Sequence, residues 1–245
     1  MPIVVILVVW QLLTVFSSNI ESVLPPPADI GRRLVEVLGE SATWLQIGQT
    51  LEGWALSLVV ASLIGLALGI LLGSSAIAYR MARFVVDFLR SVPPIALLPV
   101  GLLTLGAALQ LKVALATFAA LWFLLIQVIH GIWDVEPMMK DVARSYHISP
   151  MLRLTHIVIP SVSAYFSTGL RLASIAALGT VVATEFLGGV DGMGLAIYNA
   201  QLGGDMSRTY AYGIVIVVLA LVLNSSLLAV ERRLLRWHPM HRRAA

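Results

Sequence analysis

The sequence lacks cysteine altogether and contains few charged residues. Without cysteine, disulfide bonds, thiolate metal sites and cysteine nucleophiles are all excluded. Charged residues make up 12% of the 245 positions, and the lysines among them are Lys112 and Lys140. Neither lysine ends a phosphate-binding loop, because leucine precedes one and methionine the other. We therefore expect no nucleotide cofactor in this chain, and any ATP chemistry must belong to another protein.

The sequence also lacks the residue spacing typical of a metal site or of a catalytic nucleophile with its base. The histidines lack neighbouring carboxylates in metal-ligand spacing, and the pair His238 and His241 lies in a basic tail, where metal binding would be adventitious. Ser74 and His130 are a conceivable nucleophile and base, but no nucleophile elbow surrounds Ser74. We expect no metal site. An intramembrane enzyme is the alternative class, which turnover by the isolated chain would reveal.

Hydrophobic residues are abundant instead, at 59% of the chain with a mean hydropathy of +0.92. A soluble domain has too little interior for so many apolar side chains, so the composition predicts a protein surrounded by membrane lipid. The net charge of +3 would suggest a nucleic-acid partner if the cations clustered on one exposed face. They lie mostly at the ends of apolar segments, so we expect no nucleic-acid binding.

Six apolar segments are candidates for membrane-spanning helices, since about 20 apolar residues cross a bilayer. They are Met1–Ile20, Trp54–Leu72, Ile95–Leu109, Val113–Ile132, Tyr165–Leu187 and Tyr212–Val230. The first lacks a basic leading region and a clear cleavage site, so we expect it to be retained, with cleavage near Ser17-Ser18 as the alternative. The third is the shortest, and it and the fourth are candidates for a tilted or partly re-entrant arrangement.

The distribution of cations predicts the orientation of these spans. With both termini in the cytoplasm, twelve cations lie inside: Arg80, Arg83, Arg90, Lys140, Arg144, Arg153, Arg171, Arg232, Arg233, Arg236, Arg242 and Arg243. Four lie outside: Arg32, Arg33, Lys112 and Arg208. Cytoplasmic loops carry the excess of Lys and Arg, so this bias places the polar segment between the fourth and fifth spans inside.

That polar segment, Gly131–Pro160, contains the start and stop signals of two short helices. Pro137 suits the first turn of one helix, with Glu136 as its N-cap, and this helix should run to about Tyr146. Ser149-Pro150 has the same pattern, an N-cap residue followed by proline in the first turn. It predicts a second helix, which should stop near Pro160.

The first of these helices has a small polar face. Asp141, Arg144 and Ser145 lie three and four residues apart and therefore on one side of the helix. Such a face suits docking to a partner. The alternative is a solvated loop that only links two spans.

These residues resemble a known family. Asp141-Val142-Ala143-Arg144, with the lead-in Val135-Glu136-Pro137 and the later Pro160, is similar to the EAA signature of bacterial ABC importer permeases. In that family the segment is a cytoplasmic coupling helix that docks on a separate ATPase. The resemblance implies docking by seven residues: Asp141, Val142, Ala143, Arg144, Ser145, Tyr146 and His147.

His147 stands where the family has glycine. A residue just after a helix often has positive φ, and histidine is among the few residues other than glycine that are enriched in that conformation. His147 therefore ends the helix, or else makes a pH-sensitive contact of its own.

Two further regions resemble the nitrate/sulfonate/taurine branch of these permeases. One is the run Arg90-Ser91-Val92-Pro93-Pro94-Ile95-Ala96-Leu97-Leu98-Pro99. The other comprises Gly169–Ala173 and Glu185–Gly188, followed by Gly192-Met193-Gly194-Leu195. The resemblance covers residues 25 to 230, and its order and spacing are more specific than any one motif.

The resemblance implies an all-α membrane protein with about six transmembrane helices in a MetI-like permease fold. It implies a homodimer, a cytoplasmic ABC ATPase dimer that uses ATP and Mg, and an extracytoplasmic substrate-binding protein, all at the bacterial inner membrane. The expected organisation is a first helix at 1–20, an outer segment at 21–53, a core at 54–230 with the coupling segment at 133–160, and a basic cytoplasmic tail at 231–245. The helical spacing of Ile30, Leu34, Val37 and Leu38 predicts an interfacial helix in the outer segment.

The expected solute is a small anion such as a sulfonate, nitrate or an aromatic carboxylate, with a thiamine precursor as the alternative. The candidate pathway residues are Glu185, Thr180, Thr184, Gln127, Pro94 and Pro99. Carboxylates in spans usually face a bundle interior and a partner, although Glu185 is close enough to the span end for interfacial exposure. Helix packing explains the hydroxyl and amide groups equally well. Glycines at 188, 189, 192 and 194 predict an irregular loop at the outer mouth.

Overall fold

The computed structural model describes residues 9–11, 14, 24–135, 138–139, 141 and 145–234, and the regular structure in this part of the chain is helical. The helices are α3 (Pro27–Gly39), α4 (Ser41–Gly73), α5 (Ala76–Arg90), the 3₁₀ helix η1 (Pro94–Leu97), α6 (Leu98–Leu105), α7 (Leu109–Trp133), α9 (Pro150–Arg153), the π-helix η2 (Leu154–Val158), α10 (Ile159–Gly188), α11 (Met193–Leu202) and α12 (Met206–Leu234).

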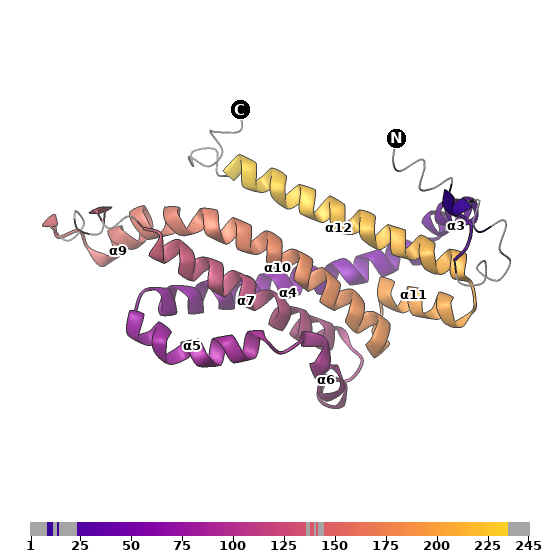
Figure 1. Cartoon of the computed structure of the whole chain (residues 1–245), viewed down its shortest axis with the longest axis horizontal. Helices are drawn as coiled ribbons and strands as arrows, with labels where there is room; N and C mark the ends of the chain where they lie inside the picture. The colour runs from indigo at the N-terminus through magenta and orange to yellow at the C-terminus, as the bar shows by residue number, and fades with distance from the viewer. Residues whose placement is uncertain are drawn as a thin grey trace.

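The long helices lie side by side in an elongated bundle, with α9 at one end and α3 and α11 at the other (Figure 1). Helix α7 packs against both α4 and α10. Small residues permit this close approach: a Cβ atom added at Gly65 of α4 would lie 2.8 Å from the Leu124 Cβ of α7, and one at Gly69 would lie 2.6 Å from the Val128 Cβ. The core between the three helices is formed by Leu58, Ala61, Ala116, Ala120, Leu124, Ala173, Ala177 and Val181.

Four helices, α4, α7, α10 and α12, are long and apolar enough to cross a membrane. They contain the second, fourth, fifth and sixth predicted spans. Helix α4 begins at Ser41, thirteen residues before the predicted start at Trp54. The first predicted span, Met1–Ile20, lies almost entirely outside the described residues.

The third predicted span, Ile95–Leu109, is not one helix, because the run of η1 and α6 ends at Leu105 and Leu109 already starts α7. Helix α5 and the segment Pro94–Leu105 together are apolar enough for one span, but they are bent by 79° at the break between them. Prolines 93 and 94 lack backbone donors and interrupt the helix there. Sequence reasoning missed α5 because its arginines lower its hydropathy, although Met81 and Phe84 form part of an exposed apolar face.

Pro160 does not end the helix that starts at Pro150, contrary to the prediction. That helix continues through the π-helical stretch Leu154–Val158 into α10. Proline removes one helical hydrogen bond, and a π-helical turn adjusts the backbone just before it. The predicted N-cap at Ser149 is present, since its Oγ accepts a hydrogen bond from Leu152 N at 3.4 Å.

The helix predicted from Ile30 to Leu38 corresponds to α3. Its buried residues, Ile30 and Val37, face the bundle, where Val37 packs with residues of α11 and α12. Arg33 reaches Asp205 at 3.1 Å, and Arg208 pairs with Glu40. A hydrogen bond to Glu36 and the charge of Asp205 raise the pKa of Arg33. These contacts fix α3 against the start of α12.

Candidate functional site

A cavity of about 740 Å³ lies beside the break between α5 and η1, where α7 and α10 form its other walls. Its lining is mainly apolar and includes Val92, Pro93, Pro94, Ile95, Ala119, Trp122, Phe123, Ile126, Leu172, Ile175, Ala176, Gly179 and Ala183. Arg90, Ser91, Gln127 and Thr180 add polar groups. An apolar cavity with a few convergent polar groups is the usual form of a small-molecule site.

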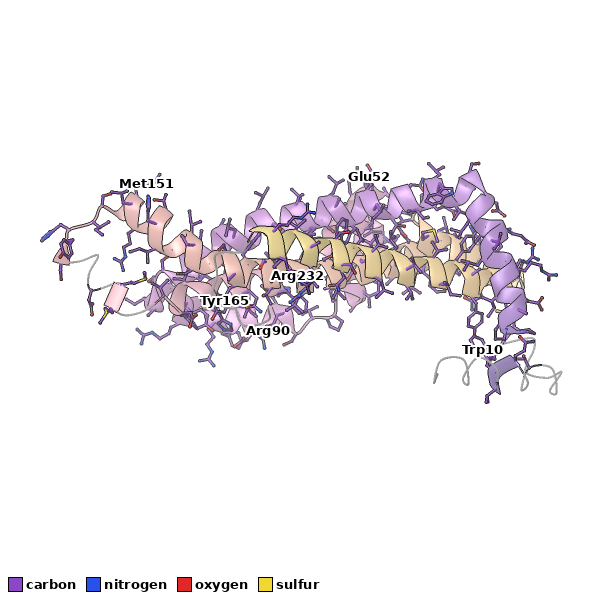
Figure 2. The ribbon with its side chains drawn as sticks, turned by 90° about the horizontal axis from the view of Figure 1, so that it is seen from above. Trp10, Glu52, Arg90, Met151, Tyr165 and Arg232 are labelled. Carbon is purple, nitrogen blue, oxygen red and sulfur yellow. The ribbon has the colours of Figure 1, made fainter. Side chains whose placement is uncertain are left out.

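Arg90 reaches this cavity because α5 turns back along the bundle. Ser75 caps the start of α5, its Oγ accepting a hydrogen bond from Ala78 N at 3.2 Å. Fifteen residues then carry the chain about 22 Å along the bundle, at 1.5 Å per residue. Arg90 thus lies level with Trp122 to Gln127 in the middle of α7. Figure 2 shows it well inside the length of the bundle, between Met151 and Trp10.

Three of the cations used to predict the orientation lie at informative places on the helices of the bundle. Arg90 ends α5, and Arg171 lies within α10, where its Nη1 is 3.8 Å from Glu231 Oε2 of α12. Lys112 is buried in the first turn of α7. The predicted orientation, with its division of the cations between the two sides of the membrane, stays a prediction.

Lys112 forms a buried ion pair with Glu185 near the opposite end of the bundle from α9. Lys112 is 2% exposed and Glu185 is fully buried, and 2.8 Å separates Nζ from Oε1. The ammonium group also donates to the carbonyl oxygens of Gln49 at 2.9 Å and Asp191 at 2.7 Å. All three of its protons therefore have acceptors, which offsets the cost of burying the charge.

The carboxylate of Glu185 is equally well satisfied. The hydroxyl of Thr50 donates to it, at 2.9 Å from Oε2, and the backbone N–H of Gly194 donates to Oε2 at 3.1 Å. Thr50 in turn accepts a hydrogen bond from Met193 N at 2.9 Å. This network, called the buried ion-pair network below, ties α4, α7 and α10 to the start of α11. A closed network of this kind positions helices and leaves no room for a solute.

The predicted pathway residues separate into two groups in the structure. Gln127, Thr180 and Pro94 line the cavity, and Pro99 is not among its lining residues. Thr184 and Glu185 are fully buried. Thr184 donates its hydroxyl to Thr180 O at 2.7 Å, so its polar group is used within α10.

Arg90 is the charged residue of the cavity lining, and the sequence-based pathway prediction did not include it. The sequence did contain a signal for it, since Arg90 comes three residues before Pro93-Pro94. Irregular backbone at such prolines must face protein or a water-filled cavity, so a neighbouring cation is close to that cavity.

Four of the predicted docking residues are exposed and lie in the segment between α7 and α10: Asp141, Ser145, Tyr146 and His147. The other three, Val142, Ala143 and Arg144, lie outside the described residues. His147 has a φ of 50°, which confirms the expected positive φ at that position. The predicted loop glycines Gly189 and Gly192 also have positive φ, at 66° and 150°.

The comparisons with known proteins decide the family. A model of the binding-protein-dependent transport system inner membrane component matches residues 61–236. The chain belongs to this family. It is 27% identical to the taurine transport system permease protein of Escherichia coli K12, over 96% of this chain and 87% of that protein. It is 28% identical to the nitrate import permease protein of Synechocystis, over 94% and 86%.

A third relative of this permease, the putative aliphatic sulfonates transport permease protein of Bacillus subtilis, is 29% identical over 95% of this chain and 84% of that protein. Among solved structures, the inward-facing MetNI methionine ABC transporter superposes with a TM-score of 0.68 at 21% identity, covering 81% of this chain and 98% of that chain. An amino acid ABC transporter superposes with a TM-score of 0.64 at 18% identity, over 80% and 93%. These likenesses show the MetI-like permease fold.

The expected all-helical MetI-like fold and the family are therefore confirmed, and the resemblance to the nitrate, sulfonate and taurine branch is confirmed with them. The expected number of about six spans stays a prediction. The chain is a permease component of an ABC importer and an inner-membrane transport subunit.

Proposed function

We propose that this permease carries a small anion through the cavity between α5, η1, α7 and α10. The observation that carries the proposal is the position of Arg90, a cation at mid-bundle in a cavity that is otherwise mostly apolar. The side chain of Arg90 is 49% exposed, so an anion that enters the cavity can reach its guanidinium, and the apolar walls strengthen the attraction between the two charges. Among the named solutes of the relatives, nitrate and aliphatic sulfonates are anions, and taurine, a zwitterion, carries a sulfonate group that can meet the same cation. A thiamine precursor would gain less from a fixed positive charge.

The proposed partners are a second permease copy, a cytoplasmic ABC ATPase dimer that supplies ATP and Mg²⁺, and an extracytoplasmic binding protein. The family description, a binding-protein-dependent system, supports the last of these. The exposed apolar face of α5, formed by Ile77, Met81, Phe84 and Phe88, suits membrane lipid or the second copy.

We propose that the ATPase docks on residues 141–147 at the cytoplasmic face, with both termini on that side. Exposed side chains support this assignment, since Tyr146 is 78% exposed and lies beyond the packed part of α7 and α10. The family's coupling helix lies at the corresponding place in the sequence.

The test is transport by the whole complex. The permease, its ATPase and its binding protein are reconstituted in proteoliposomes and given labelled nitrate, bicarbonate, taurine or an alkanesulfonate, called the four probes below. We expect ATP-dependent uptake of at least one of the four probes and no uptake with a non-hydrolysable ATP analogue. Uptake of none of them, or turnover by the isolated permease, would contradict the proposal.

Cross-linking tests the docking site and the orientation together. The chain has no cysteine, so Ser145→Cys and Ser207→Cys each introduce one reactive thiol at opposite ends of the bundle. In the complex, Ser145→Cys is expected to cross-link to the ATPase, and Ser207→Cys is not. The reverse pattern would overturn the orientation and the docking assignment.

His147 gives a further prediction at this docking segment. Because its φ is positive, His147→Gly should keep transport and ATPase stimulation near wild type, and His147→Val should lower both several-fold. Uptake and ATPase rate are measured for both variants between pH 6 and 8, where a histidine titrates. If the Gly variant lost coupling while it stayed folded, the imidazole would make a specific contact and the helix-end explanation would be wrong.

A further inference from the structure

The break between α5 and η1 concentrates positive charge at one place in the cavity wall. Among the lining residues, which are all in the described part of the chain, Arg90 carries the only formal charge. Its neighbours across the cavity include Gln127 of α7, whose amide is a hydrogen-bond donor, and the apolar walls formed by Trp122 and Ile175.

The charge of Arg90 is only partly neutralised. Asp87, one turn earlier on α5, lies between two arginines, with its carboxylate 3.6 Å from Arg83 Nε and 3.8 Å from Arg90 Nε. Two cations share one carboxylate, so the group keeps one net positive charge. The separation of 3.8 Å also exceeds a hydrogen-bond length. Within the described part of the chain, the guanidinium of Arg90 has no acceptor at hydrogen-bond distance, and its side chain is about half exposed.

The size of the cavity limits how a solute is recognised. A volume of about 740 Å³ is within the range of sites for drug-sized ligands and exceeds what nitrate or a small sulfonate fills. A small anion would share the cavity with water, so shape gives little selection. A guanidinium instead binds planar or tetrahedral oxyanions through paired N–H donors, whatever the rest of the solute.

We propose that Arg90 is the charge-selecting contact of the translocation cavity, donating from its guanidinium to the oxygens of a carboxylate, nitrate or sulfonate, with the Gln127 amide as the second donor. This inference rests on the proposed function and deepens it. It places the anion at the α5–η1 break and assigns the buried ion-pair network, at the far end of α10, no part in recognition.

The first test compares Arg90→Gln and Arg90→Lys in the reconstituted complex, with whichever of the four probes the wild type imports. Arg90→Gln should lower uptake on the order of tenfold to a hundredfold, the effect of losing a hydrogen bond to a charged group. Arg90→Lys should lose less uptake than Arg90→Gln, because the charge remains although the paired N–H donors are lost. Arg83→Gln is the matched control, since Arg83 lies on the same helix, shares Asp87 and does not line the cavity. It should stay within about twofold of wild type.

A second test changes the charge at position 90 after the protein has folded. The variant Arg90→Cys has one cysteine in a permease that otherwise has none, so a thiol reagent modifies that position alone. The folded variant is treated with aminoethyl methanethiosulfonate. The cysteine thiolate attacks the reagent's thiol-level sulfur, methanesulfinate leaves, and the mixed disulfide formed carries an ammonium group at position 90. This treatment should restore uptake severalfold, whereas the sulfonatoethyl reagent, which leaves a negative group, should not. The cysteine-free wild-type permease in the same complex shows the effect of each reagent on the partner proteins.

The outcomes separate the two proposals. If the wild type imports none of the four probes, the proposed function fails. If the wild type imports a probe and Arg90→Gln imports it equally well, or if both reagents restore Arg90→Cys equally, Arg90 does not select charge and only the present inference fails. Equal losses in Arg90→Gln and Arg90→Lys, with both variants folded, would also overturn it.

Discussion

Lys112→Met is expected to destabilise the permease by roughly 3–5 kcal/mol, the usual cost of removing one partner from a buried ion pair. The substitution leaves the Glu185 carboxylate fully buried without its cation, and the carbonyl oxygens of Gln49 and Asp191 lose their shared donor. The apparent melting temperature of the purified permease in detergent, followed by size-exclusion fluorescence, should fall by roughly 10 °C.

A double variant distinguishes the charge from the packing. In Lys112→Met with Glu185→Gln, no charge is buried, and an amide oxygen at the position of Oε2 can still accept from Thr50 and from Gly194 N. Much of the lost stability should return. Arg33→Met is the control, since the ion pairs of Arg33 are exposed and such pairs contribute about 1 kcal/mol or less. A Lys112→Met protein as stable as wild type would show that the buried ion-pair network has no structural importance.

The network also shows what sequence reasoning could and could not reach. A carboxylate inside a span is costly, so Glu185 was expected to need a partner. The partner is 73 residues away in the sequence, and no local pattern links the two. Lys112 was assigned to an outer segment because charges usually flank spans, and its burial was not predicted because its acceptors come from tertiary structure.

The long spans were predictable for a simple physical reason, because a continuous apolar run of about 20 residues has few alternatives to a membrane helix. Helix α5 was not, because Arg80, Arg83, Asp87 and Arg90 give it the composition of a loop. Its helical pattern is amphipathic, and only the contacts of the folded bundle show that its last residue faces a cavity. The same limit applies to Pro160, whose effect on the helix depends on the π-helical turn before it.

Gly194→Ala is expected to have an effect as large as Lys112→Met, although it adds one methyl group. The added Cβ would lie 2.3 Å from the carbonyl oxygen of Val182 and 2.7 Å from both the Glu185 Cβ and the backbone nitrogen of Phe186. Most of these atoms belong to the backbone of α10, which cannot move aside as a flexible side chain can. Helix α11 must therefore shift, and the hydrogen bond from Gly194 N to Glu185 is lost with it.

We expect a loss of roughly 3 kcal/mol or more, from the overpacking together with the weakened buried ion-pair network. Gly48→Ala is the matched control, because the same substitution in α4 meets no atom within 4 Å and alanine favours a helix over glycine by about 1 kcal/mol. Its melting temperature should equal or slightly exceed that of wild type. If both alanine variants melted at the wild-type temperature, the close approach of α11 to α10 would be wrong. The expected result is a lower melting temperature for both Gly194→Ala and Lys112→Met, with Gly48→Ala unchanged. Packing and charge at the end of α10 would then belong to one structural unit, because both substitutions affect the Glu185 carboxylate.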